Sequence, residues 1–165
     1  MGAFALAAGM NTGSVFVERR WRVLSRVFGG RAWEAHLALI TPVWVAAVVQ
    51  LCRLDPGSAW PLPRRLRGVG VTASPIALAL WTQTVANLGL TRFANGACFG
   101  RAGSERLRGG TFRLLRNPIY DSYALALLGA AFRKHDARFL LLALESFVLL
   151  NLIEAPIEER CLTRA

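Results

Sequence analysis

The chain has 165 residues, of which 54% are hydrophobic, and a formal net charge of +10. This length fits one domain, and the charge by itself would fit a nucleic-acid-binding protein. The distribution of the charges argues against that class, because the arginines gather in loops between long apolar segments without the interleaved aromatic residues of a base-stacking surface. The pattern instead predicts an integral membrane protein that contacts the lipid bilayer and no nucleic acid.

Residues 1–34 are predicted to form an N-terminal segment. Its first part, 1–17, is mildly apolar but lacks the basic start of a signal peptide, which predicts a short interfacial or re-entrant segment. Arginines spaced along 19–28 alternate with apolar residues and predict a basic amphipathic helix on the membrane surface.

Residues 35–165 are predicted to form one transmembrane domain. A membrane-spanning helix needs about 20 mostly apolar residues. Four segments approach this length: about 35–52, 69–90, 119–132 and 137–153. The predicted fold class is therefore all-α, an integral membrane helical bundle of about four transmembrane helices, with a fifth if the N-terminal segment enters the bilayer.

The arginines also predict an orientation. The N-terminal segment, the 91–118 loop and the C-terminal tail hold more of them than the loops on the other side. The positive-inside rule then places both termini and the 91–118 loop in the cytoplasm. The predicted location is a bacterial inner membrane or the endoplasmic reticulum; the sequence sets no oligomeric state.

The cysteines and histidines do not follow a known metal-binding or disulfide pattern. Cys52, Cys98 and Cys161 are scattered, with no CxxC spacing. We therefore expect neither a disulfide framework nor a metal site.

A basic turn precedes the third apolar segment. The residue before a proline is pushed out of helical geometry, and a proline suits the first position of a helix. Asn117 before Pro118 is therefore predicted to cap a helix. Arg113 and Arg116 would share one face of a helical turn, and Tyr120 follows in the new helix. The pattern fits a capped, interfacial helix start as well as a binding turn.

Carboxylates lie at the end of the last apolar segment, at Glu154, Glu158 and Glu159. Carboxylates at a membrane exit are costly unless they are solvated or paired. A pair of them can accept hydrogen bonds from ribose hydroxyls or an ammonium group and can offset a sulfonium charge. Pro156 is expected to break the helix between Glu154 and Glu158.

Glycines surround the end of the second apolar segment. Gly96 and Gly100 either allow helices to pack closely or leave room for a bulky cofactor.

The basic turn and the carboxylate pair, one apolar hairpin apart, resemble the membrane methyltransferases that act on isoprenylcysteine carboxylates and on phosphatidylethanolamine. The resemblance covers about 88–162 and implies S-adenosylmethionine as the cofactor. The cofactor-binding residues that it implies are Gly96, Gly100, Arg113, Arg116, Asn117, Pro118, Tyr120, Glu158 and Glu159. Asn-Pro in the turn is similar to the phospholipid branch, whereas Thr111 and Phe112 replace the Pro-Tyr of the family pattern.

The resemblance implies an enzyme that transfers a methyl group to a membrane lipid, above all to the head-group amine of phosphatidylethanolamine or its methylated derivatives. A protonated amine has no lone pair, so a carboxylate must take a proton from it. Glu159 and Asp121 are the predicted catalytic residues, and Glu154 is a further candidate. The alternatives are an isoprenylcysteine carboxyl or small-thiol methyltransferase of the same fold, and a non-catalytic membrane protein that retains the fold.

Overall fold

The computed structural model describes residues 2–53, 60–101 and 109–162. In these residues the regular structure is helical, apart from one isolated antiparallel bridge between Pro61 and Asp136. This confirms the predicted all-α class.

The main helices follow the apolar segments of the sequence. They are α1 (Gly2–Trp21), α2 (Val23–Phe28), α3 (Ala32–Arg53), α4 (Arg67–Leu88), α5 (Leu90–Phe93), α6 (Pro118–Lys134), α7 (Arg138–Ser146) and α8 (Ala155–Leu162). A π-helical stretch, η5 (Phe147–Glu154), joins α7 to α8 without interruption. Short 3-10 turns are η1 (Gly29–Arg31), η2 (Arg64–Leu66), η3 (Gly96–Phe99) and η4 (Gly110–Arg113).

Three helical stretches of the described chain are long and apolar enough to cross a membrane: Val23–Arg53, Arg64–Leu88 and Arg138–Cys161. The sequence predicted about four. The difference is α6, which has 17 residues. At about 1.5 Å per residue it extends about 26 Å, less than the hydrocarbon core of about 30 Å. α6 is therefore a bundle helix that does not reach the length of a full span.

The N-terminal helix α1 lies inside the bundle, against α3 and α7. Phe4, Ala7 and Val15 on α1 are buried. The predicted basic helix over 19–28 is interrupted at Arg22, whose φ is 53°. The domain boundary predicted between 34 and 35 falls inside α3 and stays a prediction.

The interruption at Arg22 is stabilised by the last turn of α1. The Glu18 carboxylate accepts hydrogen bonds from the backbone N–H groups of Leu24 and Ser25, at 2.8 and 3.2 Å. These are orphan donors at the start of α2, where a negative charge is favourable. Glu18 therefore caps α2 from the preceding helix.

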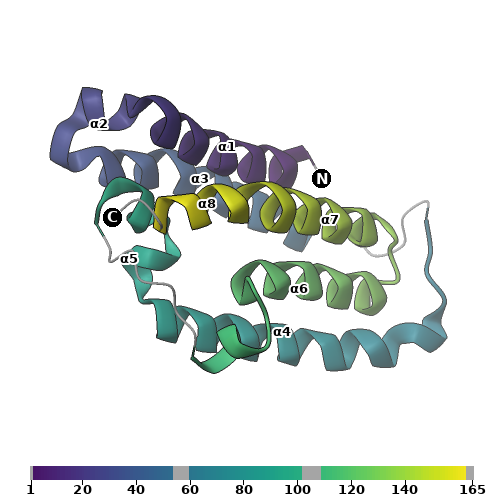
Figure 1. The fold of residues 1–165 in the computed structure, drawn as a ribbon. Coiled ribbons are helices and arrows are strands. Elements are labelled where there is room, and N and C mark those ends of the chain that lie inside the picture. Colours follow the sequence, from purple (N-terminus) through teal and green to yellow (C-terminus); the bar gives the residue numbers. More distant parts are fainter. Residues whose placement is uncertain (1, 54–59, 102–108, 163–165) are drawn as a thin grey trace.

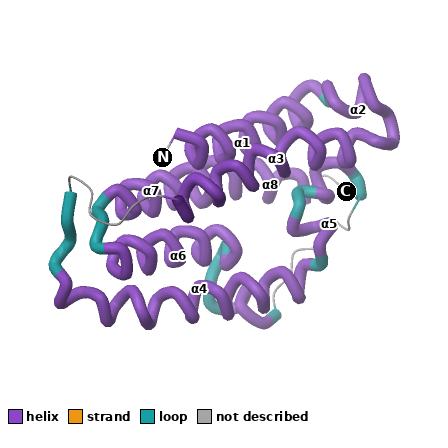
Figure 2. Tube along the Cα trace, turned by 180° about the vertical axis from the view of Figure 1, so that it is seen from behind, coloured by secondary structure: helices purple, strands orange, loops and turns teal. Residues whose placement is uncertain are grey.

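The helices pack in the order α3, α1, α7, α6, α4, although this is not their order in the chain. Figures 1 and 2 show α1 and α3 on one side, α4 and α6 on the other, and the continuous α7–η5–α8 rod between them. α5 and η3 cross from the end of α4 to the start of α3. There the Trp33 indole N–H donates to the Ala94 carbonyl at 2.9 Å, and Arg101 pairs with Glu34 at 2.6 Å.

The tightest helix pair is α4 with α6, and glycines make it possible. A Cβ added to Gly70 would lie 2.7 Å from the Gly129 carbonyl oxygen and 2.8 Å from the Arg133 backbone nitrogen. A Cβ on Gly129 would lie 2.7 Å from Ser74 Oγ. Small residues let membrane helices approach until their backbones touch. This contact fixes α6, and with it the basic turn, against α4.

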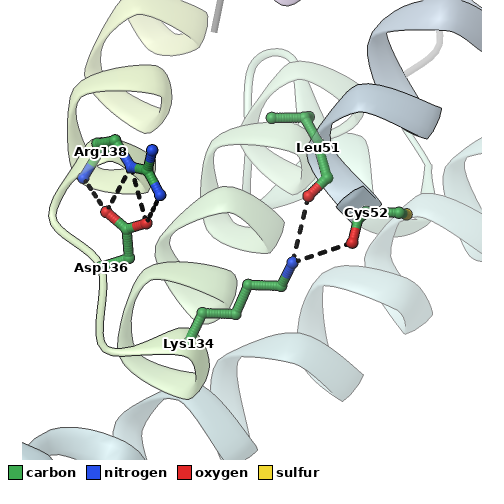
Figure 3. A network of polar contacts seen from close by, with 5 residues as sticks. All are labelled: Leu51, Cys52, Lys134, Asp136 and Arg138. Carbon is green, nitrogen blue, oxygen red and sulfur yellow. Dashed lines mark hydrogen bonds and ion pairs between the residues drawn. The ribbon is translucent and has the colours of Figure 1, made fainter. Parts of the chain in front are cut away.

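Polar contacts lie at the turn between α6 and α7 and at the end of α3 (Figure 3). Lys134 Nζ donates to the Leu51 and Cys52 carbonyls at 3.2 and 3.4 Å, which satisfies acceptors at the end of α3. The buried Asp136 carboxylate accepts from the Arg138 backbone N–H at 2.9 Å and pairs with its guanidinium at 2.6 Å. The Lys134 bonds join α3 to the α6–α7 hairpin, whereas the Asp136–Arg138 pair lies within the hairpin.

The close approach of α4 and α6 gives a direct prediction. We expect Gly70→Ala to lower the free energy of unfolding by about 1–3 kcal/mol, because the added methyl group overlaps backbone atoms of α6. Gly68→Ala, on the same helix with no atom within 4 Å of the new Cβ, should leave stability unchanged or raise it by up to about 1 kcal/mol. Thermal unfolding of both variants in detergent measures this, and equal melting temperatures would contradict it.

Candidate functional site

A cavity of about 130 Å³ with several charged side chains in its wall lies where α4, η3, α6 and α8 meet. Six of the residues predicted from the sequence line it: Arg116, Asn117, Pro118, Tyr120, Glu158 and Glu159. The basic turn and the carboxylate pair are thus brought together from positions about 40 residues apart in the sequence. We call this space the polar cavity.

The other predicted site residues do not line the polar cavity. Gly96 lies between two residues that do, Asn95 and Ala97, but its own Cβ position is only 2.4 Å from the Thr91 carbonyl oxygen. Gly100 has a φ of +68° and open space beside it, and Arg113 is exposed on the preceding turn. The structure therefore gives Gly96 a packing reason of its own, while the cofactor roles of these residues stay predictions.

Asp121, the second predicted catalytic residue, also lies outside the polar cavity. It lies in the first turn of α6 and is absent from the wall of that cavity. Its catalytic role stays a prediction.

The start of α6 sets the position of the end of the basic turn. Pro118 is the first residue of the helix and Asn117 precedes it, as predicted. The Asn117 carbonyl accepts from the backbone N–H groups of Tyr120 and Asp121 at 3.0 and 3.1 Å. The Asn117 side chain makes no cap hydrogen bond and instead borders the polar cavity. The proline therefore starts the helix and leaves the amide available to a ligand.

Arg116 and Glu159 form a two-pronged ion pair beside the polar cavity. Arg116 Nε and Nη2 donate to the two Glu159 oxygens at 2.8 and 2.6 Å. The Arg116 side chain is 67% exposed and that of Glu159 25% exposed. The hydrogen bonds and charge of Glu159 raise the pKa of the Arg116 guanidinium above its ordinary value. The pair joins the basic turn to α8, although an exposed pair of this kind adds little stability.

The helix does not break at Pro156, contrary to the sequence-based expectation. η5 continues into α8, and Pro156 is the second residue of α8. A proline removes one backbone donor and crowds the preceding turn. The π-helical register of η5, which is wider than an α-helix, accommodates this change. Glu154 and Glu158 therefore stay on one continuous rod.

A disulfide between Cys98 and Cys161 corrects the expectation that the cysteines are unpaired. Their Cα atoms are 5.1 Å apart, and the bond links η3 to the end of α8. The two cysteines are 63 positions apart in the sequence, too far for a spacing pattern to indicate the bond. The bond fastens together two walls of the polar cavity, whereas Cys52 is free and exposed.

The two departures from the family pattern, Thr111 and Phe112, both have a place in the structure. Thr111 is buried, and its hydroxyl lies 3.4 Å from that of Thr84 on α4. Phe112 lines the polar cavity. The substitutions therefore change the surroundings of the cavity without removing its wall.

A second, apolar cavity of about 680 Å³ lies between α3 on one side and α4 and α6 on the other. We call it the apolar cavity. It shares four lining residues with the polar cavity, namely Phe93, Asn95, Ile119 and Tyr120. The rest of its wall is mostly apolar and aromatic, with Trp44 stacked on Tyr123 at 6.0 Å between ring centroids.

Glu154 borders the apolar cavity and is fully buried. Its carboxylate accepts hydrogen bonds from Asn11, Thr12 and Tyr120, the last two at 2.5 and 3.2 Å. Glu158 lies beside both Glu154 and Tyr120. Tyr120 thus stands between the carboxylates of the two cavities.

A model of the phospholipid methyltransferase family matches residues 65–165. The chain belongs to this family. No curated protein and no solved structure matches it significantly.

The family match begins just before α4, so all residues predicted from the resemblance lie inside it. The helices α1 to α3 lie outside the match, yet they supply Asn11 and Thr12 to Glu154 and one wall of the apolar cavity. Sequence reasoning missed these two residues. Their signal was two adjacent polar side chains in an otherwise apolar segment.

Asn95 was also missed, although it borders both cavities and donates to the Asn11 amide oxygen at 3.3 Å. It has a φ of 61°, a conformation in which asparagine is enriched among non-glycine residues. An asparagine directly before a glycine was the available signal for such a turn.

The disulfide gives the second prediction. We expect Cys98→Ser to lower the free energy of unfolding by about 2–4 kcal/mol, because the bond closes a long loop in the unfolded chain. Cys52→Ser should have little effect, since that thiol is free and exposed. Thermal unfolding of both variants, with and without a thiol reductant, measures this. A reductant that leaves the melting temperature of the wild-type protein unchanged would contradict it.

Proposed function

We propose that this phospholipid methyltransferase family member transfers a methyl group from S-adenosylmethionine to the head-group amine of a membrane phospholipid, phosphatidylethanolamine or its methylated derivatives. The observation that carries the proposal is the junction of the two cavities at Tyr120 and Asn95. A polar cofactor and an apolar lipid need two spaces of different character that meet at one point.

The residues of the polar cavity suit S-adenosylmethionine. Glu158 and Glu159 offer acceptors for ribose hydroxyls and for the methionine ammonium group, and their charge would offset a sulfonium. Arg116 offers a partner for the methionine carboxylate. When bound, S-adenosylmethionine would supply an electrophilic methyl group. In this proposal Asn117 and Tyr120 complete the cofactor wall.

The apolar cavity suits the lipid. Its wall of aliphatic and aromatic side chains, among them Trp44, Val48 and Leu127, matches an acyl chain. The outer surfaces of the spans carry exposed apolar side chains such as Ile76, Leu78 and Leu144, as expected for a lipid-facing bundle. A phospholipid would pass from the bilayer into this cavity with its head group directed at Tyr120.

The chemistry requires mainly positioning. Holding an amine in line with a methyl donor replaces a bimolecular encounter with a unimolecular step. The amine must also lose a proton before it can attack. Glu159 and Asp121 were predicted for this step, but Glu159 is engaged with Arg116 at the cavity edge and Asp121 borders neither cavity.

We further propose that the polar cavity faces the cytoplasm, as the distribution of arginines favours. The disulfide beside the cavity is more typical of an oxidising compartment, so the orientation calls for a direct measurement. Cys52 is a natural reporter, because it lies near the end of α3 that is remote from the polar cavity and is free and exposed.

For a cytoplasmic site, we expect a membrane-impermeant maleimide to label Cys52 in intact cells or right-side-out vesicles, since its end of α3 then faces outward. Cys52→Ser is the control that must abolish the label. Labelling that occurs only after the membrane is permeabilised would reverse the orientation.

The activity is tested with labelled methyl from S-adenosylmethionine and detergent-solubilised protein, offered phosphatidylethanolamine and a prenylcysteine analogue separately. We expect label in the phospholipid. Glu159→Gln should reduce kcat/KM about 10–100-fold, because it removes one charge-assisted hydrogen-bond partner. Glu34→Gln, which alters another exposed glutamate–arginine pair, is the matched control and should retain activity.

Label only in the prenylcysteine ester would move the protein to the carboxyl methyltransferases. Absence of label in either acceptor, together with absence of cofactor binding, would indicate a non-catalytic protein that retains the fold.

A further inference from the structure

Glu154 is the most deeply placed carboxylate of the site. The exposed fraction of its side chain is 0%, and it is the last residue of η5, directly before α8. Three side chains from two other helices donate to it: Asn11 and Thr12 from α1, and Tyr120 from α6. Asn95 is held beside this group through its bond to Asn11. The carboxylate is thus oriented from several directions.

All three donors are electrically neutral. Neutral donors orient a carboxylate and stabilise its negative charge, but they do not cancel it. Among the described residues no arginine, lysine or histidine forms an ion pair with Glu154. Asp136 is the other carboxylate among these residues with an exposed fraction of 0%. Unlike Glu154, it is paired with a cation, Arg138. A buried charge without a cation inside the protein is costly, and an ionisable group at membrane depth marks a functional site by default.

The position of Glu154 indicates where a cation would come from. The residue borders the apolar cavity, which is open enough for a lipid chain and otherwise offers a mostly apolar wall. A lipid in this cavity with its head group at the junction would bring that group to Glu154 and Tyr120. The missing positive charge would then be that of the ligand.

We propose that Glu154 is the receptor for the protonated amine of the lipid head group and the acceptor of its proton. This inference rests on the proposed function and names the substrate class of the same site. It selects lipids with a protonatable amine over prenylcysteine carboxylates, because a buried carboxylate repels an anionic acceptor.

The step balances as follows for a primary amine. One N–H bond of the ammonium group breaks, the proton goes to a Glu154 oxygen, and the nitrogen keeps the electron pair. That pair forms the new N–C bond to the methyl carbon while the C–S bond breaks, and its electrons stay on the sulfur of S-adenosylhomocysteine. The product is an ammonium with one more methyl group, and Glu154 holds one proton. Tyr120 and Glu158 lie next to Glu154, on the side of the polar cavity.

The test is lipid binding without S-adenosylmethionine, so it does not depend on turnover. Detergent-solubilised full-length protein is titrated with phosphatidylethanolamine, with N-acetylated phosphatidylethanolamine and with a farnesylcysteine carboxylate. The two phospholipids have the same acyl chains. Tryptophan fluorescence reports occupancy, because Trp44 and Trp81 line the apolar cavity. We expect the wild-type protein to bind phosphatidylethanolamine at least about tenfold more tightly than its N-acetylated form.

Glu154→Gln keeps the shape and removes the charge. We expect this variant to lose the preference for the amine and to bind the farnesylcysteine carboxylate more tightly than the wild-type protein does. Glu145→Gln is the matched control, because it makes the same change on the same helical rod at a residue that borders neither cavity. It should keep the wild-type preference.

Equal binding of the two phospholipids by the wild-type protein overturns the inference even if Glu154→Gln fails to fold. An amine preference that survives in Glu154→Gln also overturns it. Methyl-transfer assays on the same preparations separate the two proposals. Methylation without an amine preference in binding removes only the role of Glu154, whereas an amine preference without methylation supports that role and removes the proposed activity.

Discussion

The arrangement of the site depends on a carboxylate that is withdrawn from water. Glu154 is fully buried at the end of η5, and a buried carboxylate must be satisfied by donors that the fold brings to it. Those donors lie on α1 and α6, so the hydrogen bonds of one side chain hold together the N-terminal helix, the helix of the basic turn and the last helical rod. The N-terminal helix is therefore part of the site, although it lies outside the part of the chain that matches the family.

The division into a polar and an apolar cavity follows from how the helices pack. α3 packs on α1 and α4 packs on α6, which leaves the space between α3 and the α4–α6 pair for the apolar cavity. The polar cavity forms at one end of that space, where the Cys98–Cys161 bond holds α8 against η3 and the exposed Arg116–Glu159 pair links α8 to the basic turn. Two spaces of different character therefore share a wall at Tyr120.

The family match covers the chain from just before α4 onward, and the polar cavity is built from that part of the chain. Thr111 packs against Thr84 where the family pattern has a proline, and the glycines Gly70 and Gly129 bring α4 and α6 into backbone contact. These features set the position of the basic turn without adding a group to the cavity. The reactive surroundings of a membrane enzyme are therefore built partly from packing contacts between helices that carry no chemistry themselves.

The sequence by itself determined the all-α class, the positions of the apolar helices, the start of α6 at Pro118 and the pairing of a basic turn with a carboxylate pair. These features depend on local rules: the length of an apolar segment, the backbone restriction of a proline and the spacing of motif residues. Only the tertiary structure decided that α1 enters the bundle, that Cys98 and Cys161 are joined, and that Asn11, Thr12 and Asn95 surround Glu154. The disulfide and the bonds of Asn11 and Thr12 to Glu154 join residues more than 60 positions apart, and no local pattern encodes which distant side chains a buried carboxylate or a cysteine will meet.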